Sequence, residues 1–191
     1  MVTKESEQTI GRDEPAPAFD LPGTSGERYS LDDFAEYEAL LVVFTCNHCP
    51  YAQAKFDLLN DLAAEYDDVA VVGINPNDAE QYPDDSFDRM TELVREGTVA
   101  YDAYLRDETQ DVARDYGAVC TPDPFLFRNE GGPEEPRFLL SYHGRLDDAL
   151  NPDDEPSEFY VRQAIDSVLA GDPVELEFLP SRGCSIKWRD D

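Results

Sequence analysis

The chain contains short, dense apolar runs separated by longer amphipathic segments. Residues 39–45 form one almost unbroken apolar run, and residues 69–74 form a second. Runs of this length are typical of strands that are buried on both faces. Between them, residues 50–66 carry apolar side chains at three- and four-residue spacings, which predicts an amphipathic helix. A strand, a helix and a strand in this order predict a parallel crossover at the centre of an α/β fold.

The rest of the pattern surrounds this crossover. Residues 11–30 are rich in proline and glycine, which predicts an irregular entry ending in a short hairpin. Further along we expect helices over 85–96, 108–116 and 156–170, an extended stretch over 99–105, and hairpin strands over 124–128 and 137–142. The order predicts a central mixed sheet flanked by helices.

The chain has the length of one domain. Its 191 residues contain no internal repeat and no low-complexity linker, so residues 1–191 are interpreted as a single unit. We expect residues 1–10 to be flexible. Residues 171–191 form a C-terminal tail, and Ile186 and Trp188 are expected to pack it against the body.

The charge balance excludes several classes of partner. Forty-three acidic and 15 basic residues give a formal net charge of -28, so nucleic acids and anionic membranes would be repelled. Residues 1–17 lack the basic and apolar regions of a secretion signal, and no apolar run is long enough to cross a bilayer. We therefore expect a soluble, cytoplasmic protein.

The acidic residues are spread along the whole sequence, as on a folded acidic surface. Only three basic residues are lysines, namely Lys4, Lys55 and Lys187. This composition is similar to that of proteins from salt-accumulating halophiles, although an ordinary acidic protein remains the alternative.

The candidate chemistry lies where the first buried strand meets the following helix, at Cys46-Asn47-His48-Cys49. Backbone N–H groups at a helix start stabilise a thiolate, so Cys46 is the candidate nucleophile and Cys49 the resolving thiol. Asn47, His48 and Thr45 surround the pair and are expected to modulate it. A His48 imidazole that favours the thiolate would make the couple more oxidising than that of thioredoxin.

Simpler interpretations of the same residues remain open. Cys-x-x-Cys is also half of a zinc site, but Cys120, Cys184 and His143 are isolated and supply no second ligand pair. We therefore expect no metal and no cofactor. His48 could be an ordinary solvent-facing side chain, and a purely structural disulfide is uncommon in a cytoplasmic protein.

A second informative segment is Cys120-Thr121-Pro122, which lies between a predicted helix and the hairpin. In thioredoxin folds the X–Pro bond at this position is cis and faces the active cysteines, so Thr121 and Pro122 are expected to bind substrate backbone. An ordinary trans proline is the alternative. Cys120 is placed with Thr121 and Pro122 at the substrate-binding site. Its thiol is interpreted as a buried residue, with an alternative disulfide as the second possibility.

These motifs together resemble the peroxiredoxin-like, thioredoxin-like proteins of the alkyl hydroperoxide reductase/thiol-specific antioxidant superfamily. The matching segments are APAF (16–19), FTCNHCPY (44–51), GINPND (73–78), TQDVA (109–113), YGAVCTPD (116–123) and GCSIKW (183–188). The resemblance implies a thioredoxin fold with an N-terminal extension and an insertion after the first crossover.

The sequence also departs from that family's chemistry. A peroxiredoxin carries threonine three residues and proline seven residues before its peroxidatic cysteine, but Val43 and Ala39 precede Cys46 at those distances. Thr45 replaces the tryptophan that is usual in thioredoxin, and Leu40 stands where thioredoxin keeps a buried acid. Efficient peroxide reduction is therefore not expected.

Three functions follow, in order of preference. The first is thiol-disulfide exchange between a protein substrate and an external reductant, with Cys46 attacking and Cys49 resolving. The second is a thiol-dependent peroxidase, and the third is a non-catalytic redox-sensing or binding module. Cys184 is a possible extra thiol near the site. The sequence does not specify an oligomeric state.

The charge leads to a prediction about salt. At molar salt the Debye length is about 3 Å, so repulsion between surface carboxylates is screened, whereas in dilute buffer it destabilises the compact state. We expect circular dichroism to show loss of structure as salt falls from molar to tens of millimolar. A spectrum that stays constant over this range would contradict the halophilic interpretation.

Overall fold

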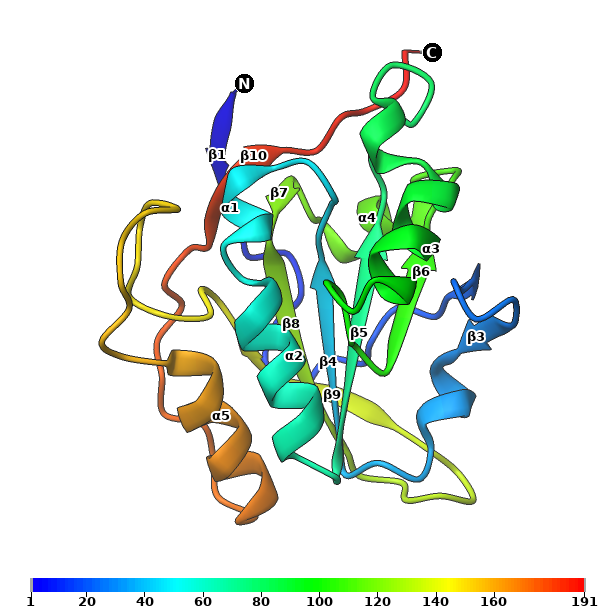
Figure 1. The fold of residues 1–191 in the computed structure, drawn as a ribbon. Coiled ribbons are helices and arrows are strands. Elements are labelled where there is room, and N and C mark those ends of the chain that lie inside the picture. The colour runs from blue at the N-terminus through cyan, green and yellow to red at the C-terminus, as the bar shows by residue number, and fades with distance from the viewer. Residues whose placement is uncertain (1, 191) are drawn as a thin grey trace.

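A computed structural model describes residues 2–190, and Met1 and Asp191 lie outside the described residues. Its main sheet has five strands in the order β6-β5-β4-β8-β9 (Figure 1). They are β4 (Ala39–Phe44), β5 (Val69–Asn75), β6 (Ala103–Arg106), β8 (Asp123–Asn129) and β9 (Phe138–His143). β4, β5 and β6 run parallel, whereas β8 is antiparallel to both β4 and β9. The predicted mixed α/β sheet is confirmed.

The central position of β4 explains its apolar sequence. All six of its residues are fully buried, and successive side chains point to opposite faces. Leu40 and Phe44 join the core on one face, whereas Leu41 and Val43 join the core on the other. A strand with two buried neighbours and two covered faces has no position for a polar side chain.

Helices cover both faces of this sheet. α2 (Phe56–Glu65) and α5 (Tyr160–Leu169) pack on one face, and α4 (Asp111–Tyr116) packs on the other (Figure 1). The segment between β5 and β6 contains the short helix η2 (Pro83–Asp85) and α3 (Phe87–Arg95). Met90 of α3 packs with Tyr104 of β6. This segment is the insertion expected after the first crossover.

The predicted helix over 50–66 is interrupted. It forms α1 (Pro50–Gln53) and α2, with Ala54 and Lys55 between them. Lys55 directs its ammonium group into the body, where Nζ lies 2.8 and 2.7 Å from the two carboxylate oxygens of Asp147. This largely buried ion pair lies where the helix is interrupted. Its two residues are 92 positions apart in the sequence, so the periodicity of residues 50–66 could not predict the interruption.

The two ends of the chain meet in a second sheet. It contains β1 (Thr3–Glu5), β10 (Arg182–Ser185) and β7 (Cys120–Thr121), with β10 in the middle and antiparallel to both neighbours. Residues 3–5, which we expected to be flexible, are therefore a paired strand. A separate small hairpin joins β2 (Asp20–Pro22) to β3 (Arg28–Ser30), followed by the short helix η1 (Leu31–Phe34).

The C-terminal tail beyond α5 returns to the body. Ile186 is buried in the core and Trp188 packs against it, with the Arg114 guanidinium 5.0 Å from the Trp188 ring centroid. Within residues 2–190, no helix is both long enough and apolar enough to cross a bilayer.

Gly183 offers a test of how tightly β10 packs. A Cβ atom at Gly183 would overlap the carbonyl oxygen of Thr121, which belongs to the backbone of β7 and cannot move aside cheaply. We expect Gly183→Ala to lower the free energy of unfolding by about 1–3 kcal/mol, as overpacking typically does. Urea denaturation under reducing conditions and constant salt measures the change.

Gly11→Ala is the matched control, because its Cβ would approach only the Glu14 side chain, at 3.3 Å. Equal stability of the two variants would contradict the close packing of β10 on β7.

Candidate functional site

The Cys46-Asn47-His48-Cys49 segment connects β4 to α1. Cys49 is the N-cap residue of α1, and Pro50 occupies the first helical position, where its missing N–H is tolerated. The backbone N–H groups of Cys49 and His48 each lower the Cys46 pKa. Cys46 and Cys49 are both fully buried. α1 is only four residues long, so the helix dipole expected to stabilise a Cys46 thiolate is that of a single turn.

Thr121 lies against the two cysteines. The Thr121–Pro122 peptide bond is cis. Thr121 Oγ1 lies 3.3 Å from Cys46 Sγ, and the Thr121 carbonyl oxygen lies 3.6 Å from Cys49 Sγ. One residue therefore contacts both sulfurs through two different oxygens.

The disulfide pairing differs from the expected one. Cys49 is bonded to Cys184 of β10, 135 residues away, with a Cα–Cα distance of 6.3 Å, while Cys46 remains a thiol. β10 places Cys184 there because it pairs with β7 in a register that sets Cys184 opposite Thr121. The outer edge of β7, which we expected to be open to substrate, is therefore occupied by the chain's own C-terminal strand, and Thr121 is fully buried.

A buried carboxylate organises the motif from a different part of the chain. Asp85, the last residue of η2, is fully buried. Its Oδ1 accepts a hydrogen bond from the Asn47 backbone N–H at 2.6 Å, and its Oδ2 lies 2.5 Å from Nδ1 of His48. Asn77 and Asn75 donate side-chain N–H groups at 2.8 and 3.4 Å. The carboxylate thus fixes both the backbone and the imidazole of the loop between the cysteines.

The other motif residues are held by further contacts. The Tyr104 hydroxyl donates to Asn47 Oδ1 at 2.6 Å, and Asn47 Nδ2 donates to the Asp84 carbonyl at 2.9 Å. The His48 ring stacks on Tyr82, with centroids 5.5 Å apart. Thr45 Oγ1 and His48 Nε2 are buried without a hydrogen-bond partner among the described residues. Asn47 is thus anchored by its side chain as well as its backbone, and Tyr82 covers one face of His48.

The environment of Cys46 favours the thiol over the thiolate. Burial raises the pKa of Cys46 to about 12, and the charge of Asp85 adds to the increase, against smaller opposing effects of Thr121 and the backbone N–H groups. In this state His48 Nδ1 lies against Asp85 Oδ2. The stabilisation of a Cys46 thiolate by His48, and with it the more oxidising couple, stays a prediction.

Asp85 was not predicted from the sequence. Leu40 stands where thioredoxin keeps a buried acid, and the buried acid of this structure comes from η2. One carboxylate among 43 acidic residues carries no signal of its own. Asn75 and Asn77, which directly follow the apolar run over 69–74, were the available indication that a buried polar group lies near this end of the strand.

Three side chains that are able to bind a metal meet beside Cys46. One ligand atom each from Cys46, His48 and Asp85 lies within 4.8 Å of the others, and among the described residues these three form the candidate group. Both Asp85 oxygens already interact with the donor groups described above, so this set offers a metal few free lone pairs. The expected absence of a metal was argued from Cys120, Cys184 and His143, without Asp85.

Cys120 lies outside the cysteine cluster formed by Cys46, Cys49 and Cys184. Its Sγ is 3.9 Å from the Ser181 carbonyl oxygen, and burial together with the charge of Asp123 raises its pKa. Asp123 is itself buried against His143, whose Nε2 lies 2.8 Å from Oδ1. Burial raises the Asp123 pKa, and the contact with His143 opposes the increase. Cys120 is therefore a buried thiol, and its place in substrate binding stays a prediction.

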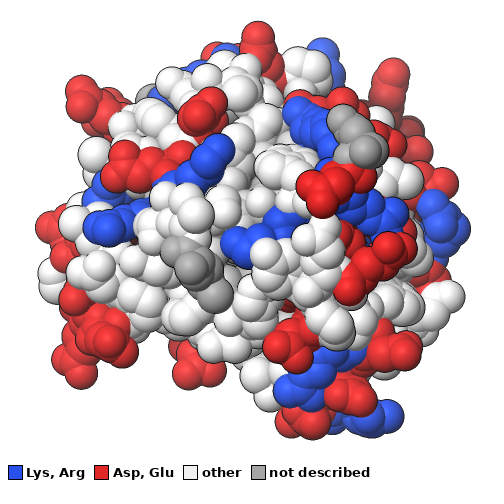
Figure 2. Space-filling view, turned by 90° about the horizontal axis from the view of Figure 1, so that it is seen from above, with Lys and Arg blue, Asp and Glu red and all other residues white. Residues whose placement is uncertain are grey.

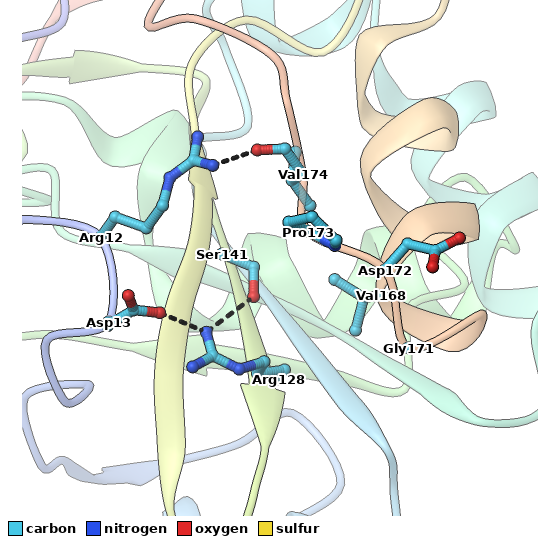
Figure 3. A pocket seen from close by; sticks show the side chains of 9 residues that line it. All are labelled: Arg12, Asp13, Arg128, Ser141, Val168, Gly171, Asp172, Pro173 and Val174. Carbon is cyan, nitrogen blue, oxygen red and sulfur yellow. Dashed lines mark hydrogen bonds and ion pairs between the residues drawn. The ribbon is translucent and has the colours of Figure 1, made fainter.

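A separate cavity of about 290 Å³ lies at the opposite end of the sheet, near Arg12, Arg128 and residues 171–174 (Figure 3). Its guanidinium groups already have partners. Arg12 donates to the carbonyl oxygens of Val174 and Leu176, and Arg128 binds Asp13 and Glu130. Through Arg12, the wall of this cavity holds the start of the C-terminal tail against the body. The cavity lies away from the cysteines.

The fold and the site define a thioredoxin-like protein, with Cys-x-x-Cys after the central strand and a cis-proline beside it. The chain belongs to the AhpC/TSA family, whose model matches residues 13–148. The peroxiredoxin-like, thioredoxin-like resemblance is confirmed, and the family supports a thioredoxin-like redox function.

Two solved structures resemble nearly the whole chain. An uncharacterized conserved protein from Geobacillus kaustophilus is 37% identical with a TM-score of 0.88, covering 100% of this chain and 98% of that one. A hypothetical protein from Sinorhizobium meliloti 1021 is 36% identical with a TM-score of 0.87, covering 98% and 100%.

A more distant structure shares the fold. It is a secreted Mycobacterium tuberculosis disulfide oxidoreductase homologous to E. coli DsbE, 16% identical with a TM-score of 0.51, covering 80% of this chain and 95% of that one. No protein with a curated description matches the chain.

The Asp85 contact predicts a change in thiol reactivity. In a Cys120→Ser background with the Cys49–Cys184 disulfide intact, Cys46 is the one remaining thiol. Asp85→Asn removes the nearby negative charge, so the Cys46 pKa falls and more thiolate is present at each pH below it. A fall of one pKa unit gives about tenfold faster alkylation, measured by mass spectrometry between neutral pH and the onset of tyrosine ionisation.

Asp84→Asn is the control, because Asp84 contacts the motif through its backbone carbonyl. Alkylation of Asp85→Asn no faster than that of Asp84→Asn would contradict the role given to the Asp85 charge.

Proposed function

We propose that this protein is a thiol-disulfide oxidoreductase in which Cys46 attacks and Cys49 resolves. The observation that carries the proposal is the placement of the Cys46 thiol beside Cys49 at the start of α1, with Thr121 in contact with both sulfurs. This arrangement allows two consecutive exchange steps at one position. AhpC/TSA membership supports it.

The exchange begins from the protein with Cys46 and Cys49 both reduced. The Cys46 thiolate attacks one sulfur of a substrate disulfide, forming a mixed disulfide and releasing the other substrate sulfur as a thiolate, which takes up a proton. The Cys49 thiolate then attacks the Cys46 sulfur. The Cys46–Cys49 disulfide forms, the substrate leaves with both cysteines reduced, and an external dithiol restores the pair. The reverse sequence would oxidise a substrate dithiol.

Proton transfer is the main requirement of the first step. Because the Cys46 pKa is raised to about 12, the proton must leave as the substrate arrives. His48 is the suitable acceptor, since one of its ring nitrogens lies within 4.8 Å of Cys46 Sγ and Asp85 binds its Nδ1. Asp85 then stabilises the imidazolium that results.

We place substrate approach at the His48–Tyr82 stack. Tyr82 is one of the exposed large apolar side chains, whereas Cys46 is fully buried, so displacement of this stack opens a route to the sulfur. Seen from this end of the molecule, uncharged and basic groups occupy much of the middle and acidic groups gather at the margin (Figure 2). The Lys187 ammonium lies 5.7 Å from the Tyr82 ring centroid. A polypeptide substrate can approach a surface of this kind without the repulsion that the acidic margin exerts on its carboxylates.

A peroxidase is the second candidate, because the family includes thiol-specific antioxidants. The family's threonine position is occupied by Val43, which is buried and has no hydroxyl group. The hydroxyl in contact with Cys46 comes from Thr121 instead. Rapid hydroperoxide consumption by the wild-type protein would favour this candidate, and inertness toward both disulfides and peroxides would leave a redox-sensing module.

Single cysteine variants test the proposed roles. Cys49→Ser should accumulate a mixed disulfide between Cys46 and a protein substrate, because the resolving thiol is absent. Cys46→Ser should accumulate none. Non-reducing electrophoresis after acid quenching, followed by mass spectrometry of the linked peptides, identifies the bonded cysteine. Cys120→Ser is the control and should resemble the wild type. Equal trapping by Cys46→Ser would reject Cys46 as the attacking group.

A further inference from the structure

Cys184 is part of the cysteine cluster, although the proposed exchange uses only Cys46 and Cys49. The described structure has a Cys46 thiol next to a Cys49–Cys184 disulfide. This state lies one exchange step beyond a Cys46–Cys49 disulfide. Cys49 is common to both bonds, so moving the disulfide requires no external oxidant.

We infer that Cys184 is a second resolving thiol, which takes over the disulfide from Cys46–Cys49 and returns Cys46 to its thiol form. The inference rests on the proposed function, since it begins where the Cys46–Cys49 disulfide has formed.

The step balances within the chain. The Cys184 thiol loses its proton and attacks the Cys49 sulfur; the Cys49–Cys184 bond forms and the Cys46–Cys49 bond breaks. Cys46 leaves as a thiolate and takes up a proton. One disulfide is present before and after, so no net oxidation occurs. An external dithiol then reduces Cys49–Cys184 and itself becomes a disulfide.

β10 holds Cys184 in place by contacts that do not involve sulfur. It pairs with β7 on one side and with β1 on the other. The following residues are also anchored: Lys187 N–H donates to Asn77 Oδ1 at 2.9 Å, and the Lys187 carbonyl accepts from Asp78 N–H and Gln110 Nε2 at 2.8 Å each. Cys184 therefore remains beside Cys49 when the disulfide is open, which gives the high effective concentration that intramolecular exchange needs.

The surroundings of Cys46 affect both directions of this exchange. Burial and the Asp85 charge raise the Cys46 pKa, so the released sulfur is held as a thiol and little thiolate is present for the return step. The same raised pKa makes Cys46 a slower leaving group in the forward step, so the position of Cys184 beside Cys49 is what supports the relay. The disulfide meanwhile moves from the motif to β10. Cys49 and Cys184 are both buried, so the reductant, like the substrate, reaches its sulfur when the site opens. The relay thus assigns substrate attack to Cys46 and reduction to the Cys49–Cys184 disulfide.

Disulfide mapping tests the inference. Fully reduced protein is mixed with one equivalent of oxidised glutathione, quenched with acid at increasing times, alkylated and digested with trypsin. Residues 29–55 carry both motif cysteines on one peptide, and residues 183–187 carry Cys184 on another. We expect the wild type to end with these peptides linked through Cys49, with Cys46 alkylated.

Variants separate this inference from the proposed function. Cys184→Ser should stop at the Cys46–Cys49 disulfide, with complete loss of the linked peptides, and Cys120→Ser should give the wild-type pattern. Cys46→Ser should form the Cys49–Cys184 bond much more slowly than the wild type. A wild-type end state of Cys46–Cys49 with alkylated Cys184, or equally fast Cys49–Cys184 formation in Cys46→Ser, overturns the relay alone. No Cys46–Cys49 disulfide in Cys184→Ser overturns the proposed function as well.

Discussion

The conformation of the loop between Cys46 and Cys49 depends on the hydrogen bonds that satisfy one buried carboxylate, that of Asp85. Removing a carboxylate from water costs several kcal/mol unless the protein supplies hydrogen-bond donors or a cation. Within residues 2–190, Asp85 has no ion pair with lysine or arginine, and its partners are Asn47, His48, Asn75 and Asn77. Two of these residues lie between the motif cysteines. The hydrogen bonds that replace water around the Asp85 carboxylate therefore determine the shape of the loop that carries Cys46.

The same carboxylate influences the chemistry in two opposing ways. Its charge disfavours a Cys46 thiolate, so Cys46 is protected as a thiol while the site is closed. In the mechanism that we propose, its contact with His48 prepares that imidazole to receive a proton when a substrate displaces the surroundings. Under this proposal the site is unreactive in the absence of substrate and becomes reactive once it opens. The buried acid beside Cys46 comes from η2, whereas Leu40 of β4 stands where thioredoxin keeps its own buried acid.

Much of the fold could be predicted because it depends on local pattern. The apolar run of β4 and the alternating hairpin strands β8 and β9 each contain their own signal. The cysteine motif and the Thr121–Pro122 bond were also recognisable. Features that join distant segments could not be recognised in the sequence. β1 is short and polar, and it is a strand only because it pairs with β10, at the other end of the chain. The Cys49–Cys184 pairing and the Asp85 contacts depend on this kind of proximity, which no spacing along the sequence encodes.

Thiol-disulfide exchange by Cys46 on protein substrates is tested most directly by the reduction of insulin by dithiothreitol. The turbidity of the released chains is followed with and without this protein. We expect the wild type to accelerate the reaction and Cys46→Ser to leave it unchanged. No acceleration by the wild type, or equal acceleration by Cys46→Ser, would contradict exchange by Cys46.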